Sequence, residues 1–357
     1  MGRAISFVSR HFRVFAGIAY LIGVIERVAV ALGEPGPVYL SPSWKMTQYF
    51  VNYFDHGFAK RAVVGTMLRP LAGLFEQPQY FVLAVMVALN IAAFVAIVLL
   101  MDRFLPHRDG VPDLAVLLRA AMVLGAVGLV QVAYDYGRLD HLVYGLSLCI
   151  VLLGLRRHHM AAALLAGLVV LVHEAFVVYA LPLVLAVLWR AESERRGVRA
   201  AIVALAPVVA VSGTAALMVL LFGNSESAAA LDIGRGQAVW SRQLIEIWVD
   251  LTPREVALLL GYWTSLLLVL IWFYAGNKRR PDLIFLATLT PVLLNLFGID
   301  QARWLAIGFF VVLMSLAIQV SAFGMRWPAL SRWQRRSLYL LCVPLGPVGS
   351  IRLMFYV

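Results

Sequence analysis

Charged residues are scarce in this chain. Asp, Glu, Lys and Arg make up only 14% of its 357 residues, whereas a soluble globular domain averages about 25%. Hydrophobic residues make up 62%, and the mean hydropathy is +0.87. A soluble fold cannot bury that much apolar surface. The composition therefore excludes an ordinary soluble domain and predicts an all-α protein surrounded by a bilayer.

Cysteine is nearly absent as well. Cys149 and Cys342 both lie inside apolar runs, so they form neither a disulfide framework nor a metal-ligand spacing. The zinc-protease motif H-E-x-x-H is missing, because His173 and Glu174 are followed by Ala-Phe-Val. No soluble domain, low-complexity tract or internal repeat stands out. These absences argue against a secreted disulfide-rich protein and against a zinc protease.

Acidic residues are fewer than basic ones, 19 against 30, which gives a formal charge of +11. In a soluble protein this excess would suggest nucleic acid. Here we attribute it to cytoplasmic loops and expect no nucleic-acid partner. Arg3, Arg10 and Arg13 before an apolar run are typical of a signal peptide, but no small-residue cleavage site stands out after that run. We expect a retained first helix.

A membrane-spanning helix needs roughly 20 mainly apolar residues. The stretch 159–189 is ambiguous, because it is long enough for one long helix or for a hairpin of two short ones. The other runs of suitable length are 14–32, 80–101, 114–134, 141–155, 200–222, 255–275, 282–298, 302–321 and 337–356.

The distribution of basic residues favours the hairpin. Cytoplasmic segments are enriched in Lys and Arg. One alternating set of segments holds 18 of them, and the longer complementary set holds 9. Placing 156–158 and 190–199 on the same, cytoplasmic side requires two helices, 159–172 and 175–189, with a turn near His173. This gives about eleven transmembrane helices in a single domain, with the N-terminus inside and the C-terminus outside. The first set is 1–13, 102–113, 156–158, 190–199, 276–281 and 325–336, and the second is 33–79, 135–140, 223–254 and 299–303.

Two outer segments are long enough to carry structure. Residues 33–79 begin as a loop and continue as a broken aromatic and apolar stretch with interspersed charges. This pattern predicts one or two amphipathic helices on the membrane surface. Residues 223–254 are first rich in Ser, Gly and Ala and then become amphipathic.

Ionisable residues at membrane depth are costly and are therefore functional candidates. The predicted topology gathers them at the outer face, with no comparable acidic clustering on the cytoplasmic side. The constellations are Asp55 and His56 with Lys60 and Arg61; Asp135, Arg138, Asp140 and His141; His173 and Glu174; Asp300 and Arg303; and Arg235 with Arg242.

Each constellation also has a purely structural interpretation. Asp140 and Asp300 each precede an apolar helix, where an Asp caps free N–H groups. Asp135 and Arg138 are spaced to pair within one helical turn, as are Asp300 and Arg303. Asp55 is typical of a solvated helix face, and the basic residues of the first loop are typical of lipid anchors. The pair of His173 and Glu174 differs, because long apolar runs flank it on both sides.

Together these residues indicate an outer cavity that binds an anion such as a phosphate diester. Arginine binds phosphate through a planar fork, and a carboxylate can act as general base toward a hydroxyl. Asp and Glu oxygens also suit Mg²⁺ or Mn²⁺, while metal-independent chemistry is equally compatible with the pattern. The sequence pattern does not decide between a metal-dependent and a metal-independent site.

This layout resembles the C-type membrane glycosyltransferases, which take sugars from polyprenyl-phosphate donors at the extracytoplasmic face. The phrases FDHGFAKRAVVGT, YDYGRLDH, VHEAF and GIDQARW are similar to membrane proteins of bacterial surface-polysaccharide loci, including polymerase-like ones. The resemblance implies that an acidic residue of the first outer loop is the base, which is Asp55 or, less well, Glu34. The usual acidic pair soon after the first span is absent, since Asp55 is followed by His56.

From this resemblance we expect a glycosyltransferase or polysaccharide polymerase of the bacterial inner membrane. Its partners would be a polyprenyl-phosphate-linked sugar, a glycan acceptor and membrane lipids. Asp55 would be the base, with Asp140 and Glu174 as competing candidates and His173 as orienting group. The expected substrate-binding residues are Lys60, Arg61, Asp135, Arg138, Arg235, Arg242, Asp300 and Arg303.

Two other functions fit the composition. A transporter or flippase of a lipid-linked or anionic substrate typically has broken helices and related halves, and neither is evident in the sequence. A non-catalytic scaffold for envelope assembly would use the charges only to hold helices together.

Overall fold

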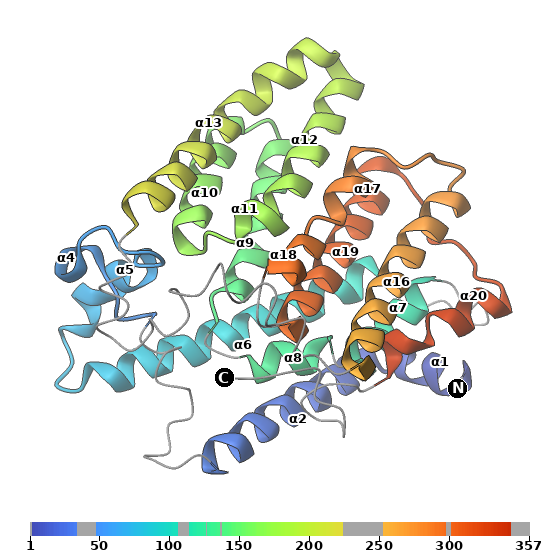
Figure 1. Cartoon of the computed structure of the whole chain (residues 1–357), viewed down its shortest axis with the longest axis horizontal. Coiled ribbons are helices and arrows are strands. Elements are labelled where there is room, and N and C mark those ends of the chain that lie inside the picture. Colours follow the sequence, from blue (N-terminus) through green and yellow to red (C-terminus); the bar gives the residue numbers. More distant parts are fainter. Residues whose placement is uncertain are drawn as a thin grey trace. The chain divides into compact units, whose positions relative to one another are not determined.

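The computed structural model describes residues 2–33, 48–105, 114–125, 127–135, 138–223, 253–297 and 301–343. Within these ranges every helical prediction finds a helix, and no extended strand occurs (Figure 1). Five helices are long and apolar enough to cross a membrane: Pro78–Phe104, Leu114–Tyr134, Val198–Phe222, Pro253–Gly276 and Arg303–Phe323. The all-helical, membrane-embedded class predicted from composition is therefore confirmed at this level.

The chain divides into two compact units, and the boundary falls within helix α6 (Pro78–Phe104). Unit 1 comprises residues 1–33, 94–135 and 241–357, and unit 2 comprises 34–93 and 136–240. Helices α6 and α13 (Val198–Phe222) leave most of their apolar side chains uncovered by protein. Apolar faces of this extent need a lipid environment.

Unit 1 is built around α19 (Gln301–Phe323), which is buried along most of its length. Thr288 donates to Ser315 at 2.7 Å, and Gln319 donates to the same hydroxyl at 3.2 Å. Such contacts hold helices together where water is absent. The other described elements of unit 1 are α1 (Gly2–Arg10), α2 (Phe12–Gly33), α7 (Leu114–Leu124), α8 (Leu129–Tyr134), α16 (Pro253–Gly276), α17 (Leu283–Thr288), α18 (Val292–Phe297), α20 (Arg332–Ser337) and the 3₁₀ helix η2 (Tyr339–Cys342).

Four segments of unit 1 show detail beyond the sequence predictions. Residues 1–13, expected as a basic cytoplasmic segment, contain α1, which buries Ile5, Val8 and Ser9 and meets α2 at 95°. The expected span 114–134 is confirmed as a stretch long and apolar enough to cross a membrane, and it is divided into α7 and α8 near Gly125 and Gly128. A Cβ at either glycine would lie within 2.2 Å of a backbone carbonyl oxygen, so only glycine permits this close approach.

The expected span 282–298 is also broken, into α17 and α18. Pro291 lies at the break, where it removes an N–H donor and disfavours helix at the preceding residue. The start of the expected span 337–356 forms the end of α20 and η2, and its remainder lies outside the described residues.

Unit 2 is a bundle of short and long helices (Figure 1). Helix α13 packs against both α10 and α12, and α9 contacts the same two helices. Besides α13 and the first part of α6, the unit contains α4 (Tyr53–His56), α5 (Val63–Ala72), α9 (Asp140–Leu155), α10 (His159–Val172), α11 (Phe176–Tyr179) and α12 (Leu181–Arg196).

The hairpin predicted within 159–189 is present. Helix α10 ends at Val172, and the chain resumes as α11 and α12. His159 Nε2, on the first residue of α10, lies 3.7 Å from Glu192 Oε1 near the end of α12. Arg195 donates to the Leu155 carbonyl oxygen at the end of α9. The basic segments 156–158 and 190–199 therefore lie at one end of the bundle, as the distribution of charge predicted.

The short helices expected in 33–79 are also present as α4 and α5, while 34–47 lies outside the described residues. Helix α5 buries Val63, Val64 and Gly65 and exposes Met67 and Leu71. A Cβ at Gly65 would lie 2.0 Å from the Val51 carbonyl oxygen, so α5 is in direct backbone contact with the segment before α4. The expected second outer loop falls almost wholly outside the described ranges.

Candidate functional site

Four residues predicted from the sequence come together in unit 2. They are Arg61, Asp140, His173 and Glu174, which we call the Glu174 cluster. The turn between α10 and α11 presents two of them. His173 is the C-cap of α10 and has extended backbone angles (φ −156°, ψ 110°), so the chain leaves the helix at this point. Asp140 is the first residue of α9, and Arg61 precedes α5.

Asp140 and His173 form a buried pair. Their side chains are only 2% and 1% exposed, and His173 Nε2 lies 3.4 Å from Asp140 Oδ1. The Ala175 backbone N–H donates to His173 Nδ1 at 3.2 Å. Because Nδ1 accepts a hydrogen bond, the proton of a neutral imidazole lies on Nε2 and faces Asp140. The pair therefore has a defined tautomer and orientation.

Arg61 and Glu174 form a bidentate ion pair. Arg61 Nη2 donates to Glu174 Oε1 at 2.6 Å, and Arg61 Nε donates to Oε2 at 3.0 Å. The two side chains are 29% and 33% exposed, so a ligand from outside can reach them. This fork is the geometry by which arginine binds either carboxylate or phosphate. A phosphate can therefore compete with Glu174 for Arg61.

The backbone of Arg61 is strained. Its φ is +61°, a left-handed conformation that costs a residue with a side chain about 1–3 kcal/mol and often marks a functional site. Burial lowers the pKa of Arg61, but the charge of Glu174 and its hydrogen bonds outweigh burial and raise that pKa. The charge of Asp140 acts in the same direction, and that of Arg138 opposes it. Arg138 thus belongs to the same electrostatic neighbourhood.

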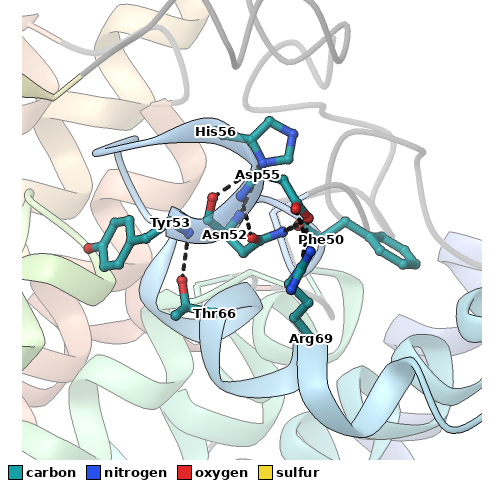
Figure 2. A network of polar contacts seen from close by, with 7 residues as sticks. All are labelled: Phe50, Asn52, Tyr53, Asp55, His56, Thr66 and Arg69. Carbon is teal, nitrogen blue, oxygen red and sulfur yellow. Dashed lines mark hydrogen bonds and ion pairs between the residues drawn. The ribbon is translucent and has the colours of Figure 1, made fainter.

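Asp55, the base expected from the resemblance, lies in a separate network (Figure 2). Arg69 donates to both of its carboxylate oxygens, at 2.6 and 2.8 Å. Asn52 donates to it at 2.8 Å and also caps α4 by accepting from the Asp55 backbone N–H. These hydrogen bonds, that of Arg69 first, hold the pKa of Asp55 below its ordinary value. Burial raises the pKa of Glu174, but the charges of Arg61 and His173 and the Arg61 hydrogen bonds outweigh burial and lower that pKa as well, so either carboxylate must leave its arginine before it can act as a base. The arrangement around Asp55 favours an anchoring role.

The remaining predicted residues are dispersed. Lys60 is partly buried, with its Cγ beside Gly223. Asp135 is buried in unit 1 and accepts a hydrogen bond from Gln131. The Arg303 guanidinium lies 4.5 Å from the ring centre of Trp304, also in unit 1. Asp300, Arg235 and Arg242 lie outside the described residues, as does Glu34.

Two acidic residues of the segments predicted to be cytoplasmic also form ion pairs. Glu192 is 1% exposed and pairs with Arg196 at 2.9 Å. Asp102 accepts from Arg13 and from Arg119, a buried arginine that also donates to the Leu105 and Ser9 carbonyl oxygens. Arg119 stands alone in the apolar run 114–134, and a lone charge in a span is a signal that would have revealed this network.

Tyr49 was also missed. It is 2% exposed, and burial, with a smaller contribution from the charge of Asp140, raises its pKa. It belongs to the aromatic stretch YFVNYF, which the sequence pattern assigned to an amphipathic surface helix. A neutral hydroxyl here lies in the electrostatic neighbourhood of Asp140.

No protein-family model, no curated protein and no solved structure matches the chain. Within the part of the chain that the structure describes, no group of three or more His, Cys, Asp and Glu residues has the arrangement of a metal site. The chemistry must therefore be argued from the Glu174 cluster itself.

Proposed function

We propose that this protein is a membrane glycosyltransferase that uses a polyprenyl-phosphate-linked sugar at the extracytoplasmic face of the bacterial inner membrane. The observation that carries the proposal is the bidentate pair of Arg61 and Glu174 beside the buried pair of Asp140 and His173. It combines a phosphate-binding fork with a carboxylate, next to the α5 surface helix. Helix α5 exposes apolar side chains suited to a lipid substrate.

In this mechanism the donor phosphate takes the place of Glu174 on Arg61, with Arg138 adding positive charge. Glu174, released from the arginine, accepts the proton of the acceptor hydroxyl. The acceptor oxygen then bonds to the anomeric carbon, and the bond from that carbon to the phosphate oxygen breaks. Polyprenyl phosphate leaves with its negative charge held by the arginines. Asp140 and His173 position the turn that carries Glu174.

The topology that goes with this function has eleven spans, with the N-terminus in the cytoplasm. The spans are the five long helices, α2, α9, α10, the segment formed by α11 and α12, the broken pair α17 and α18, and residues 337–356. This places the Glu174 cluster outside and the basic end of the α10–α12 hairpin inside.

The test is transfer from a synthetic polyprenyl-phosphate sugar by the purified protein, read as release of polyprenyl phosphate. Glu174→Gln is nearly isosteric and cannot accept the proton, so turnover should fall about 10²–10⁴-fold. Glu194→Gln is the matched control, because Glu194 is an exposed glutamate of α12 paired with Arg190. Asp55→Asn should retain most of the activity.

If Asp55→Asn abolishes transfer at unchanged thermal stability while Glu174→Gln does not, the roles are reversed and the base is Asp55. Activity that is normal in both variants would remove the Glu174 cluster from the chemistry.

A second function, transport of a lipid-linked or anionic substrate, is favoured by one observation. Apolar stretches are broken at 125–128, 173–175 and 289–291, and discontinuous helices are typical of transporter binding sites. Vesicles distinguish the two functions. A transporter moves the intact lipid-linked sugar between leaflets without an acceptor, whereas a transferase releases polyprenyl phosphate only when an acceptor is present.

A further inference from the structure

A cavity of about 440 Å³ lies at the other end of the α10–α12 hairpin from the Glu174 cluster. His159 begins α10 and His173 follows its last residue, so at 1.5 Å per residue the two ends are about 20 Å apart. The cavity is therefore a separate place in unit 2. Its lining residues, which we call the His159 pocket, are His159, Arg196, Arg199, Ala200, Val203 and Ala204.

The polar part of the pocket is positively charged. Behind it, buried Glu192 lies 2.9 Å from Arg196 Nη2 and 3.7 Å from His159 Nε2. In these contacts the negative charge of Glu192 balances the positive charge of Arg196. Arg199 is exposed, and no ion pair of Arg199 occurs among the described residues. The pocket thus keeps a net positive charge that no group among the described residues neutralises.

His159 adds unsatisfied polar atoms to this part of unit 2. Its side chain is 17% exposed, and both ring nitrogens are buried without a hydrogen-bond partner in the described structure. Buried polar atoms are nearly always hydrogen-bonded, and an exception calls for a water, ion or ligand. The contact with Glu192 is too long to satisfy the ring.

The other half of the pocket is apolar and continues onto lipid-facing surface. Ala200, Val203 and Ala204 form this wall, and Val203 is 68% exposed. The neighbouring Ile202 and, on α10, Met160 are 56% and 61% exposed. A cationic mouth that opens onto exposed apolar helix faces suits a molecule with an anionic head and a hydrocarbon tail.

We infer that the His159 pocket binds the phosphate headgroup of an anionic membrane phospholipid. The phosphate oxygens accept from Arg196 and Arg199, and an acyl chain lies along Val203 and Ile202. A zwitterionic headgroup carries its own cation into this positive mouth and binds less well. The inference does not depend on the proposed transferase activity, because no residue is shared with the Glu174 cluster.

The test is thermal unfolding of the full-length, delipidated protein in detergent, titrated with phosphatidylglycerol, with phosphatidylcholine or with inorganic phosphate. Phosphatidylglycerol should raise the Tm more than phosphatidylcholine with the same acyl chains. Arg199→Gln should raise the phosphatidylglycerol concentration at half-maximal stabilisation about tenfold, as expected for one charge-assisted hydrogen bond. Arg195→Gln is the matched control, since Arg195 is an exposed arginine near the end of the preceding helix α12 but does not line the pocket.

Two results would overturn the inference. An equal shift in Arg199→Gln and Arg195→Gln would reduce the effect to general surface charge. Inorganic phosphate that reproduces the whole stabilisation at the same concentration would identify a soluble anion as the ligand instead of a lipid.

Discussion

Unit 2 contains two bidentate arginine–carboxylate pairs with nearly the same geometry. Arg69 holds Asp55 at 2.6 and 2.8 Å, and Arg61 holds Glu174 at 2.6 and 3.0 Å. Their surroundings differ. The side chains of the first pair are 49% and 44% exposed, whereas those of the second are 29% and 33% exposed and adjoin a buried Asp140 and His173.

The comparison shows that hydrogen-bond geometry alone does not identify a functional pair. Water screens the charges of Asp55 and Arg69, so their pairing orders a surface loop and contributes little else. Around Glu174 the screening is weaker, and the charges of four residues act on one another. The same side-chain chemistry is thus structural in one place and suited to substrate binding in the other.

The first prediction tests whether both pairs face the same side of the membrane. In a variant without Cys149 and Cys342, His56→Cys and Arg138→Cys should react with an impermeant thiol reagent from outside. Arg195→Cys and Arg279→Cys should not react, because they lie in segments rich in basic residues. If Arg195→Cys is labelled from outside, the hairpin has the orientation opposite to the predicted one, and both arginine–carboxylate pairs lie on the cytoplasmic side.

The second prediction concerns stability. Arg61→Gln leaves the partly buried Glu174 without its partner and should lower the free energy of unfolding by about 1–3 kcal/mol. Arg69→Gln should produce no comparable decrease, because both members of that pair are solvated. Thermal unfolding of the two variants side by side measures the contrast. Equal destabilisation would mean that the difference in exposure has no energetic consequence.

The third prediction separates the two arginines by ligand binding. Arg61→Lys keeps the charge and loses the planar fork, so the affinity for a polyprenyl-phosphate donor should fall about two- to tenfold. Arg69→Lys should bind the donor like the wild type. Donor titration by intrinsic tryptophan fluorescence or calorimetry provides the measurement. If both lysine variants bind as the wild type does, Arg61 does not contact the phosphate.

The smallest effect is the pH dependence that Asp55 contributes. Folding lowers its pKa from an ordinary value of 3.8, mainly through Arg69 and then Asn52. The stabilisation is therefore present above about pH 3.8 and is lost as pH falls through the lower, folded pKa. The wild type should unfold at slightly higher temperature than Asp55→Asn near neutral pH, and the two should converge in strong acid. A gap that widens in acid would contradict the assigned pairing.

Much of this architecture follows from local sequence. Apolar runs of 20 or more residues predicted α6, α13, α16 and α19 to within a few residues, because lipid-facing helices have few alternatives. The break at His173 was predicted by requiring two basic segments to share a side. The break at Gly125 was not, since glycine is common inside transmembrane helices and its need for close contact appears only in three dimensions.

The sequence predicted which residues form the site, but it did not predict which of them pair. Arg61, Asp140, His173 and Glu174 were each named because ionisable groups are rare in apolar surroundings. That Arg61 reaches Glu174, 113 residues away, depends on how α5 contacts α10. The assignment of Asp55 as the base relied on the resemblance alone. The structure shows that Arg69, on α5, already pairs with this carboxylate.

Gly65 sets the position of both arginines relative to their carboxylates. Arg61 and Arg69 lie four residues to either side of it, and its Cα lies so close to Val51 that any side chain would be driven into that carbonyl. A single added methyl group would have to lift α5 off its support and carry both guanidinium groups away from their carboxylates together. Random mutagenesis should therefore recover position 65 as a site of severe loss, although glycine has no side chain with which to touch a substrate.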